Sequence, residues 1–331
     1  MSKFKFYFIL MISGMLLFSC KDDDTEDPVP LRDFQTQYDT DNSLIETFLK
    51  THYLIETGTP GTTSEMDVAF GDMPTGDPGS LVSLWLRPDL LSKSVVSNGV
   101  TYKLYYLALR EGDATKESPS VVDEILVSYN GSYLNLDGTL KQFEYVPFPT
   151  NKIGLDQVAV QGWKEIFPLF KPGTSTVVVG EPTIYNNFGA GVIFIPSGLA
   201  YYNFATASIP SYVPLFFSFK LYDMTRSDQD EDGILSIYED RNGNGIFTDD
   251  DTDGDGVPDY QDVDDDGDGK TTKEETKIPN SFPVAYYPYN GAAADDPTTT
   301  INETLGIPSC GDNPDYLSPT RLRRYIDPSC R

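Results

Sequence analysis

Long apolar runs separated by Gly-, Pro- and Asp-rich stretches characterise the middle of the chain. The run at 100–109 has the length and the aromatic and β-branched content of a β-strand. Further runs of this kind lie at 125–129, 176–180, 192–195 and 215–221. Within this region only residues 155–170 place apolar side chains at helical spacing. The pattern predicts an α+β fold in which an antiparallel sheet wraps around one helix.

The region before these strands, residues 33–99, is expected to hold one short helix followed by loops. Ile45, Phe48 and Leu49 recur on one helical face, and Asp39 or Asp41 would cap its start. The following residues are rich in Gly and Pro, which is typical of loops. Because 39% of the 331 residues are hydrophobic, the chain is long and apolar enough for one or two packed domains.

Three short motifs and a final strand follow one another in the second half of this region. The sequence reads VSYNG at 127–131, QGW at 161–163, IPSGLAY at 195–201 and IPSYVPLFFSFKL at 209–221. This ordered series, over residues 100–224, resembles the FKBP-type family of peptidyl-prolyl cis-trans isomerases. The resemblance implies an FKBP-like antiparallel sheet around one helix and an aromatic pocket that binds prolyl peptides.

The resemblance also assigns residues to that pocket. They are Tyr129, Phe148, Val160, Trp163, Tyr201 and Phe217. Prolyl isomerisation requires no proton transfer, since its barrier of about 18–20 kcal/mol comes from amide resonance. A hydrophobic pocket that excludes water and binds the twisted amide better than either planar isomer is therefore sufficient. We expect an isomerase or folding factor that acts on proline-containing exported polypeptides.

One departure from the family keeps a second function open. The phenylalanine and aspartate that usually follow the family's Asp-Gly turn are replaced by Lys141 and Gln142, unless Phe143 enters the pocket. The alternative is a non-catalytic surface lipoprotein whose degenerate FKBP domain binds proline-containing peptides. Acidic repeats at 228–275 would then serve display or adhesion.

Residues 228–275 carry 19 Asp and Glu against three Lys and Arg, which supplies most of the net charge of −27. Four successive loops place carboxylates or amides at positions 1, 3 and 5, Gly at position 6 and an acid at position 12, as EF-hand calcium loops do. The loops leave no room for flanking helices and resemble thrombospondin type 3 repeats. That resemblance implies an irregular segment ordered by structural calcium; an acidic linker is the alternative. The expected ligands are Asp228, Asp230, Asp232, Ile234, Glu239, Asp240, Asn242, Asn244, Asp251, Asp253, Asp255, Asp262, Asp264, Asp266, Asp268 and Glu275.

The N-terminus predicts export and membrane anchoring. Lys3 and Lys5 precede an apolar run at 6–18, which is too short to span a bilayer and is typical of a signal peptide. Residues 1–19 end before Cys20 in a pattern that resembles a bacterial lipobox, which implies a lipid anchor on Cys20. Residues 20–32 would be a tether. We expect a bacterial outer-membrane lipoprotein, on the periplasmic face or the cell surface.

Composition excludes several other functions. His52 is the only histidine, so a zinc site with several imidazoles cannot form. The acidic surface repels phosphate backbones, and nucleic-acid binding is not expected. In an exported protein the remaining pair, Cys310 and Cys330, predicts a disulfide within the tail at 276–331, with two free thiols as the alternative.

Overall fold

The computed structural model describes residues 31–74, 79, 81–180, 182–292, 294, 298 and 302–330. The predicted signal peptide, Cys20 and most of the tether lie outside the described residues. Phe34–Arg331 form one compact unit, which contains the predicted sheet, the acidic segment and the tail. Within the described part of the chain, no helix has both the length and the apolar content needed to cross a membrane.

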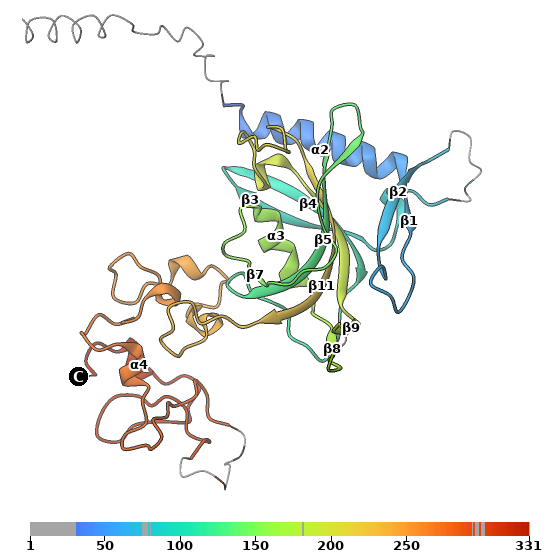
Figure 1. The fold of residues 1–331 in the computed structure, drawn as a ribbon. Coiled ribbons are helices and arrows are strands. Elements are labelled where there is room, and N and C mark those ends of the chain that lie inside the picture. The colour runs from blue at the N-terminus through green and yellow to red at the C-terminus, as the bar shows by residue number, and fades with distance from the viewer. Residues whose placement is uncertain are drawn as a thin grey trace, which may run out of the picture. The chain divides into compact units, whose positions relative to one another are not determined.

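An antiparallel sheet of seven strands forms the centre of this unit (Figure 1). Its strands are β3 (Leu90–Ser97), β4 (Val100–Arg110), β5 (Glu124–Leu134), β6 (Leu140–Val146), β7 (Ile153–Gly154), β10 (Gly189–Ile195) and β11 (Leu215–Thr225). The order is β3-β4-β10-β11-β5-β6, and β7 pairs with β5. The apolar runs around residues 100, 125, 192 and 215 thus form the strands that were predicted from them. The run at 176–180 does not, because β8 (Thr174–Thr176) ends where it begins and pairs only with β9 (Ile184–Asn186).

Apolar cores cover both faces of the sheet, so the central strands carry apolar residues on both faces. In β10, Ile193 and Ile195 join the apolar core on one face, and Val192 and Phe194 join the core on the other. All seven residues of this strand are buried. The prediction of a sheet wrapped around one helix therefore describes only one of its two covered faces.

Helices from different parts of the chain cover the two faces. The helix α3 (Gln161–Ile166) contributes Trp163 and Ile166 to the first core, and α2 (Phe34–Thr51) contributes Phe48 and Leu49 to the second. Gly162 lets α3 approach the sheet, because a Cβ atom there would lie 2.8 Å from the side chain of Ile195. The helix predicted at 155–170 is shorter in the structure and continues only as a 3₁₀ turn, Phe167–Leu169.

The N-terminal region differs from its prediction in three ways. The boundary placed between residues 99 and 100 falls inside a β-hairpin, because β3 pairs with β4. The helix α2 already begins at Phe34, so Asp41 is an interior residue and not a cap. Its fully buried carboxylate accepts hydrogen bonds from the backbone nitrogen and the hydroxyl of Ser197, at 2.7 and 2.6 Å. A hairpin of β1 (His52–Glu56) and β2 (Val68–Asp72) follows α2 in place of loops.

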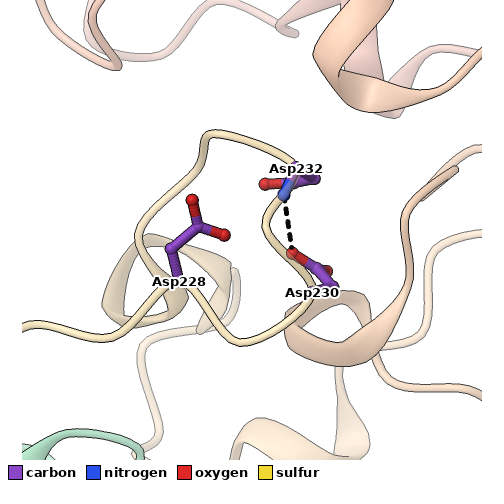
Figure 2. Close-up of side chains that lie close together, drawn as sticks. All are labelled: Asp228, Asp230 and Asp232. Atoms are coloured by element: carbon purple, nitrogen blue, oxygen red, sulfur yellow. Dashed lines mark hydrogen bonds between the residues drawn. The ribbon is translucent and has the colours of Figure 1, made fainter.

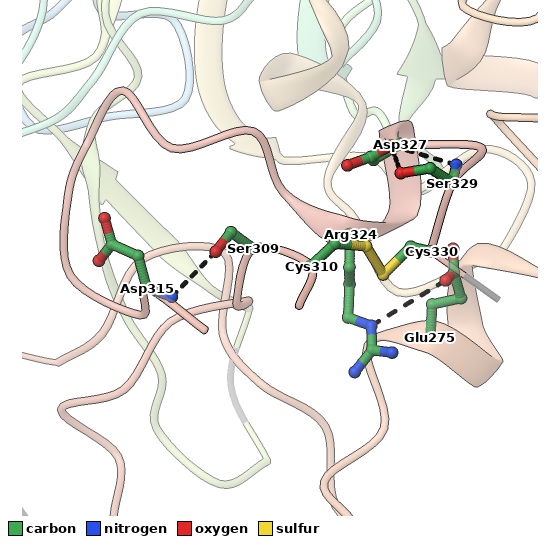
Figure 3. The surroundings of a disulfide bond; sticks show 8 residues. All are labelled: Glu275, Ser309, Cys310, Asp315, Arg324, Asp327, Ser329 and Cys330. Atoms are coloured by element: carbon green, nitrogen blue, oxygen red, sulfur yellow. Dashed lines mark hydrogen bonds and ion pairs between the residues drawn. A yellow bond between two sulfur atoms is a disulfide. The ribbon is translucent and has the colours of Figure 1, made fainter. Parts of the chain in front are cut away.

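The acidic segment and the tail have little regular structure. Short 3₁₀ turns, Ser236–Glu239, Phe247–Asp249 and Asp259–Gln261, and the single-turn helix α4 (Thr272–Glu275) end the successive loops. The predicted disulfide is present in the tail, with the Cα atoms of Cys310 and Cys330 5.5 Å apart (Figure 3). A small apolar cluster of Ile234, Ile307 and Tyr325 joins the tail to the first acidic loop.

Candidate functional site

A cavity of about 160 Å³ opens on the side of the sheet that carries α3. Its walls come from β5, β6, β7, β11, the start of α3 and the turn after β10. They are almost entirely apolar or aromatic. The lining residues are Tyr129, Phe143, Glu144, Ile153, Val158, Val160, Trp163, Tyr201 and Phe217.

Edge-to-face contacts hold the aromatic rings of this pocket in place. The ring of Trp163 lies 5.0 Å from that of Tyr129 and 5.1 Å from that of Phe217. Phe143 contacts Phe217 at 5.7 Å in the same geometry. Such contacts favour fixed ring orientations beyond the gain from burial alone. The pocket therefore has walls that are arranged before any ligand binds.

A β-bulge brings Phe143 into the pocket. In the pairing of β5 with β6, Gly131 lies opposite Glu144 and Ser132 lies opposite Gln142, which leaves Phe143 as the extra residue. Gly131 provides the space, because a Cβ atom there would lie 2.6 Å from the ring of Phe143 and 2.9 Å from that of Phe217. The glycine of the VSYNG motif is thus required by close packing within the pocket.

The bulge also places a carboxylate at the pocket. The sequence pattern did not predict this carboxylate. Glu144 lines the cavity, and its carboxylate lies beside the hydroxyl of Tyr129. Burial, together with this carboxylate, raises the pKa of Tyr129, so its hydroxyl stays protonated at neutral pH. An aromatic ring and a carboxylate are therefore present at the pocket, in Phe143 and Glu144 rather than at positions 141 and 142.

Five of the residues expected at the pocket line it, and one does not. Phe148 lies outside the cavity with its side chain 68% exposed, because the chain has already left β6 at Val146. The lining residues from the prediction are Tyr129, Val160, Trp163, Tyr201 and Phe217. The indole nitrogen of Trp163 is buried and has no hydrogen-bond partner among the described residues, which leaves a donor free for a bound molecule.

The four acidic loops fold in the same way. In each, the backbone nitrogen of the glycine at position 6 donates to the aspartate at position 1, at 2.8–3.2 Å. The nitrogens at positions 5 and 7 donate to the side chains at positions 3 and 5. These glycines have positive φ angles, a conformation that other residues adopt at a cost. They are Gly233, Gly245, Gly256 and Gly269.

In the first and fourth loops the remaining carboxylate oxygens converge. Figure 2 shows Asp228, Asp230 and Asp232 on one turn of the chain, with ligand atoms within 4.8 Å of one another. One oxygen of each of these carboxylates is buried and has no hydrogen-bond partner in the described part of the chain. The same holds for the corresponding residues of the fourth loop, Asp264, Asp266 and Asp268. Free, convergent carboxylate oxygens are the ligands that calcium prefers, so these residues fit the expected ion.

The second and third loops are more exposed. Asp251, Asp253 and Asp255 converge in the third loop, whereas the second presents the amides of Asn242 and Asn244 beside Asp240.

The acids at position 12 divide into two types. Glu239 and Glu275 are buried, and neither carboxylate has a hydrogen-bond partner among the described residues, which suits a metal ligand. Arg324 Nε lies 4.0 Å from Glu275 Oε1 (Figure 3). Asp251 and Asp262 instead accept backbone hydrogen bonds from the residues that follow them. The backbone nitrogen of Ile234 donates to Asp232, and its side chain belongs to the apolar cluster.

Comparisons with known proteins give partial matches. Residues 229–301 match the model of the BamM C-terminal family. A peptidyl-prolyl cis-trans isomerase from Pseudomonas syringae pv. tomato is similar in structure over 60% of this chain and 98% of its own, with 17% identity and a TM-score of 0.33. FkpA from Escherichia coli is similar over 40% of this chain and 51% of its own, about half its length, with 26% identity and a TM-score of 0.29. No curated protein matches the sequence.

Proposed function

We propose that this chain is a peptidyl-prolyl cis-trans isomerase or folding factor that binds proline-containing segments of exported polypeptides in the aromatic pocket. The observation that carries the proposal is the pocket itself, in which Tyr129, Phe143, Trp163 and Phe217 surround a cavity of about 160 Å³. A cavity of roughly 150 Å³ lined by apolar side chains accommodates a benzene ring. The pyrrolidine ring of proline is smaller and would fit.

The pocket residues suit isomerisation without acid–base chemistry. Apolar walls exclude water from the prolyl amide, which disfavours its charge-separated resonance form and lowers the barrier to rotation. The free indole nitrogen of Trp163 is a donor that a peptide carbonyl could accept from. Glu144 would orient the Tyr129 hydroxyl rather than transfer a proton. Donors held before substrate binds stabilise the twisted amide without reorganising.

A prolyl-peptide isomerisation assay on the full chain in detergent tests this proposal. Phe143→Ala opens one wall of the pocket and should lower kcat/KM at least about tenfold, a loss of about 1.4 kcal/mol of transition-state stabilisation. Phe148→Ala is the matched control, since this phenylalanine is exposed and outside the cavity. A rate that does not exceed background in the wild type would contradict catalysis. Peptide binding that Phe143→Ala abolishes would then support the non-catalytic alternative.

Membrane anchoring through a lipid on Cys20 is part of the same proposal. It is supported by the apolar run followed by Ser19 and Cys20, and the BamM C-terminal match supports a place at the bacterial outer membrane. Two or more acyl chains would hold the protein there, since each buried methylene contributes about 0.8 kcal/mol. Labelled palmitate should enter the wild type and not Cys20→Ser, and equal labelling of both would contradict the anchor.

We further propose that the acidic loops bind calcium in a structural role. The free, convergent oxygens of the first and fourth loops support it. Calcium would neutralise charge in a segment that has very little apolar core of its own. The residues of the aromatic pocket need no metal for the proposed chemistry.

A further inference from the structure

A second group of carboxylates lies between two acidic loops that are distant in sequence. Asp232 and Glu239 belong to the first loop, and Asp265 belongs to the fourth, where it occupies position 2 and lies outside the EF-hand ligand pattern. Their ligand atoms lie within 4.8 Å of one another. All three residues are buried, with exposed fractions of 2%, 2% and 1%.

The surrounding hydrogen bonds leave one set of oxygens free. The hydroxyl of Thr272 donates to Asp265 Oδ2 at 2.7 Å, and the backbone nitrogen of Ile234 donates to Asp232 Oδ1 at 2.6 Å. Asp265 Oδ1, Asp232 Oδ2 and both oxygens of Glu239 have no hydrogen-bond partner among the described residues. Partners that fix one oxygen of a carboxylate orient the other, as the outer shell of a metal site does.

Such an arrangement needs either bound protons or a cation to neutralise the three carboxylates. Buried carboxylates without a partner are strongly unfavourable, and adjacent like charges increase that cost. No Lys or Arg forms an ion pair with any of these three residues in the described part of the chain. Hard oxygen ligands at this density are typical of a calcium site.

We propose that Asp232, Glu239 and Asp265 bind one divalent cation, with calcium as the expected ion, that joins the first acidic loop to the fourth. This site differs from a calcium site formed within a single loop. Asp265 of the fourth loop supplies a ligand to the same ion that the first loop binds. The first loop also carries Ile234, which packs with Ile307 and Tyr325 of the tail. The cation would therefore link both loops to the apolar cluster of the tail.

Calcium titration by calorimetry of the full chain in detergent, after removal of bound metal, tests the proposal. Asp265→Asn keeps the shape of the side chain and its bond to Thr272, and should weaken one site at least tenfold. Asp264→Asn, next to it, should weaken the site within the fourth loop. Glu274→Gln removes a charge from an exposed side chain in the same segment and should leave all sites unchanged.

The outcomes separate this inference from calcium binding by the individual loops. If Asp265→Asn titrates like Glu274→Gln while Asp264→Asn weakens binding, the loops bind calcium and the site between loops does not exist. If the wild type binds no calcium, both ideas fail. Anomalous diffraction from terbium-soaked wild-type crystals needs no variant. A peak within about 2.6 Å of the Glu239 carboxylate and of Asp265 supports the site, and none there overturns it.

Discussion

The sheet domain and the acidic segment are ordered by different interactions. In the sheet, β10 is buried on both faces, and four aromatic rings of the pocket pack edge to face, those of Tyr129, Phe143, Trp163 and Phe217. In the segment 228–275, each loop is shaped by hydrogen bonds between its own carboxylates and backbone, and carboxylate oxygens remain buried and free. Apolar burial stabilises the first without a ligand. Bound calcium, as proposed, would stabilise the second by neutralising its buried carboxylates.

The structures of the two regions therefore depend on different properties of their residues. Exchanging one aliphatic core residue for another of similar volume is usually tolerated, so the sheet depends on pattern and volume. The acidic loops depend on individual oxygens at fixed positions. Conditions and substitutions that act on one region should therefore leave the other unchanged.

The largest effect is expected in the pH dependence of the metal-free protein. Burial raises the pKa of Glu239 to about 11, that of Asp265 to about 9 and that of Asp232 to about 8. Unfolded carboxyls titrate near pH 4, so the unfolded chain binds fewer protons than the folded one above that pH. The metal-free segment should therefore be most stable at acid pH and lose stability from about pH 4 towards about pH 11.

Limited proteolysis of the chelated protein at pH 5 and at pH 8 checks this prediction. We expect faster cleavage within 228–275 at the higher pH, relative to cleavage of an unstructured reference peptide at each pH. Calcium should abolish the difference. Cleavage of the chelated segment that is slower at pH 8 than at pH 5 would contradict it.

A cavity in the sheet core should destabilise the sheet without affecting calcium binding. Phe167 is fully buried between Trp163 and Phe219, and Phe167→Ala should lower the free energy of unfolding by about 3–5 kcal/mol. Leu169→Ala, in the same 3₁₀ turn but 42% exposed, is the control and should cost much less. Urea unfolding followed by tryptophan fluorescence measures both. Equal costs for the two variants would contradict the assignment of this core.

The disulfide provides a third kind of stabilisation, confined to the tail. Cys310 and Cys330 are separated by 20 residues, and closing a loop of that size contributes about 3 kcal/mol in the chain-entropy model. The double variant Cys310→Ser, Cys330→Ser should become sensitive to protease within residues 276–330. Its isomerase rate should equal that of the wild type, and a large fall in that rate would show that the tail supports the pocket.

The smallest effect is expected for a single ligand of one loop. Asp228→Asn removes one charge from the cluster with Asp230 and Asp232 and should weaken one calcium site by about tenfold, or about 1.4 kcal/mol. Glu231→Gln is the control, because this side chain is exposed and belongs to no carboxylate cluster among the described residues. Calcium titrations that are the same for both variants would contradict the role of Asp228.

The sequence pattern predicted the sheet better than its surroundings, for physical reasons. The strands β4, β10 and β11 carry mostly apolar residues, many of them aromatic or β-branched, which favours a strand over a helix or loop. The strand β3 contains Ser92, Lys93 and Ser94 at the sheet edge, where polar residues are tolerated, and its sequence resembles that of a loop. The second covered face could not be predicted because it depends on α2 packing against strands that follow it much later in the sequence.

At the candidate sites the residue types were predictable, but some of the positions were not. Ring positions such as Trp163 and Phe217 followed from the motif series, whereas Phe143 and Glu144 reach the pocket only through a β-bulge. A one-residue change of register is invisible in an apolar–polar pattern. Likewise, the acids at regular spacing indicated the loops, but Asp265 approaches Glu239 only through the tertiary fold.

Hydrogen exchange with and without calcium, measured by mass spectrometry on the full chain in detergent, tests the contrast most directly. A chelator should remove protection from amides in 228–275, while amides of β4, β10 and β11 should exchange as slowly as before. Equal protection of the segment in both conditions would show that no cation orders it. Loss of protection in the sheet as well would show that the two regions do not have separate sources of stability.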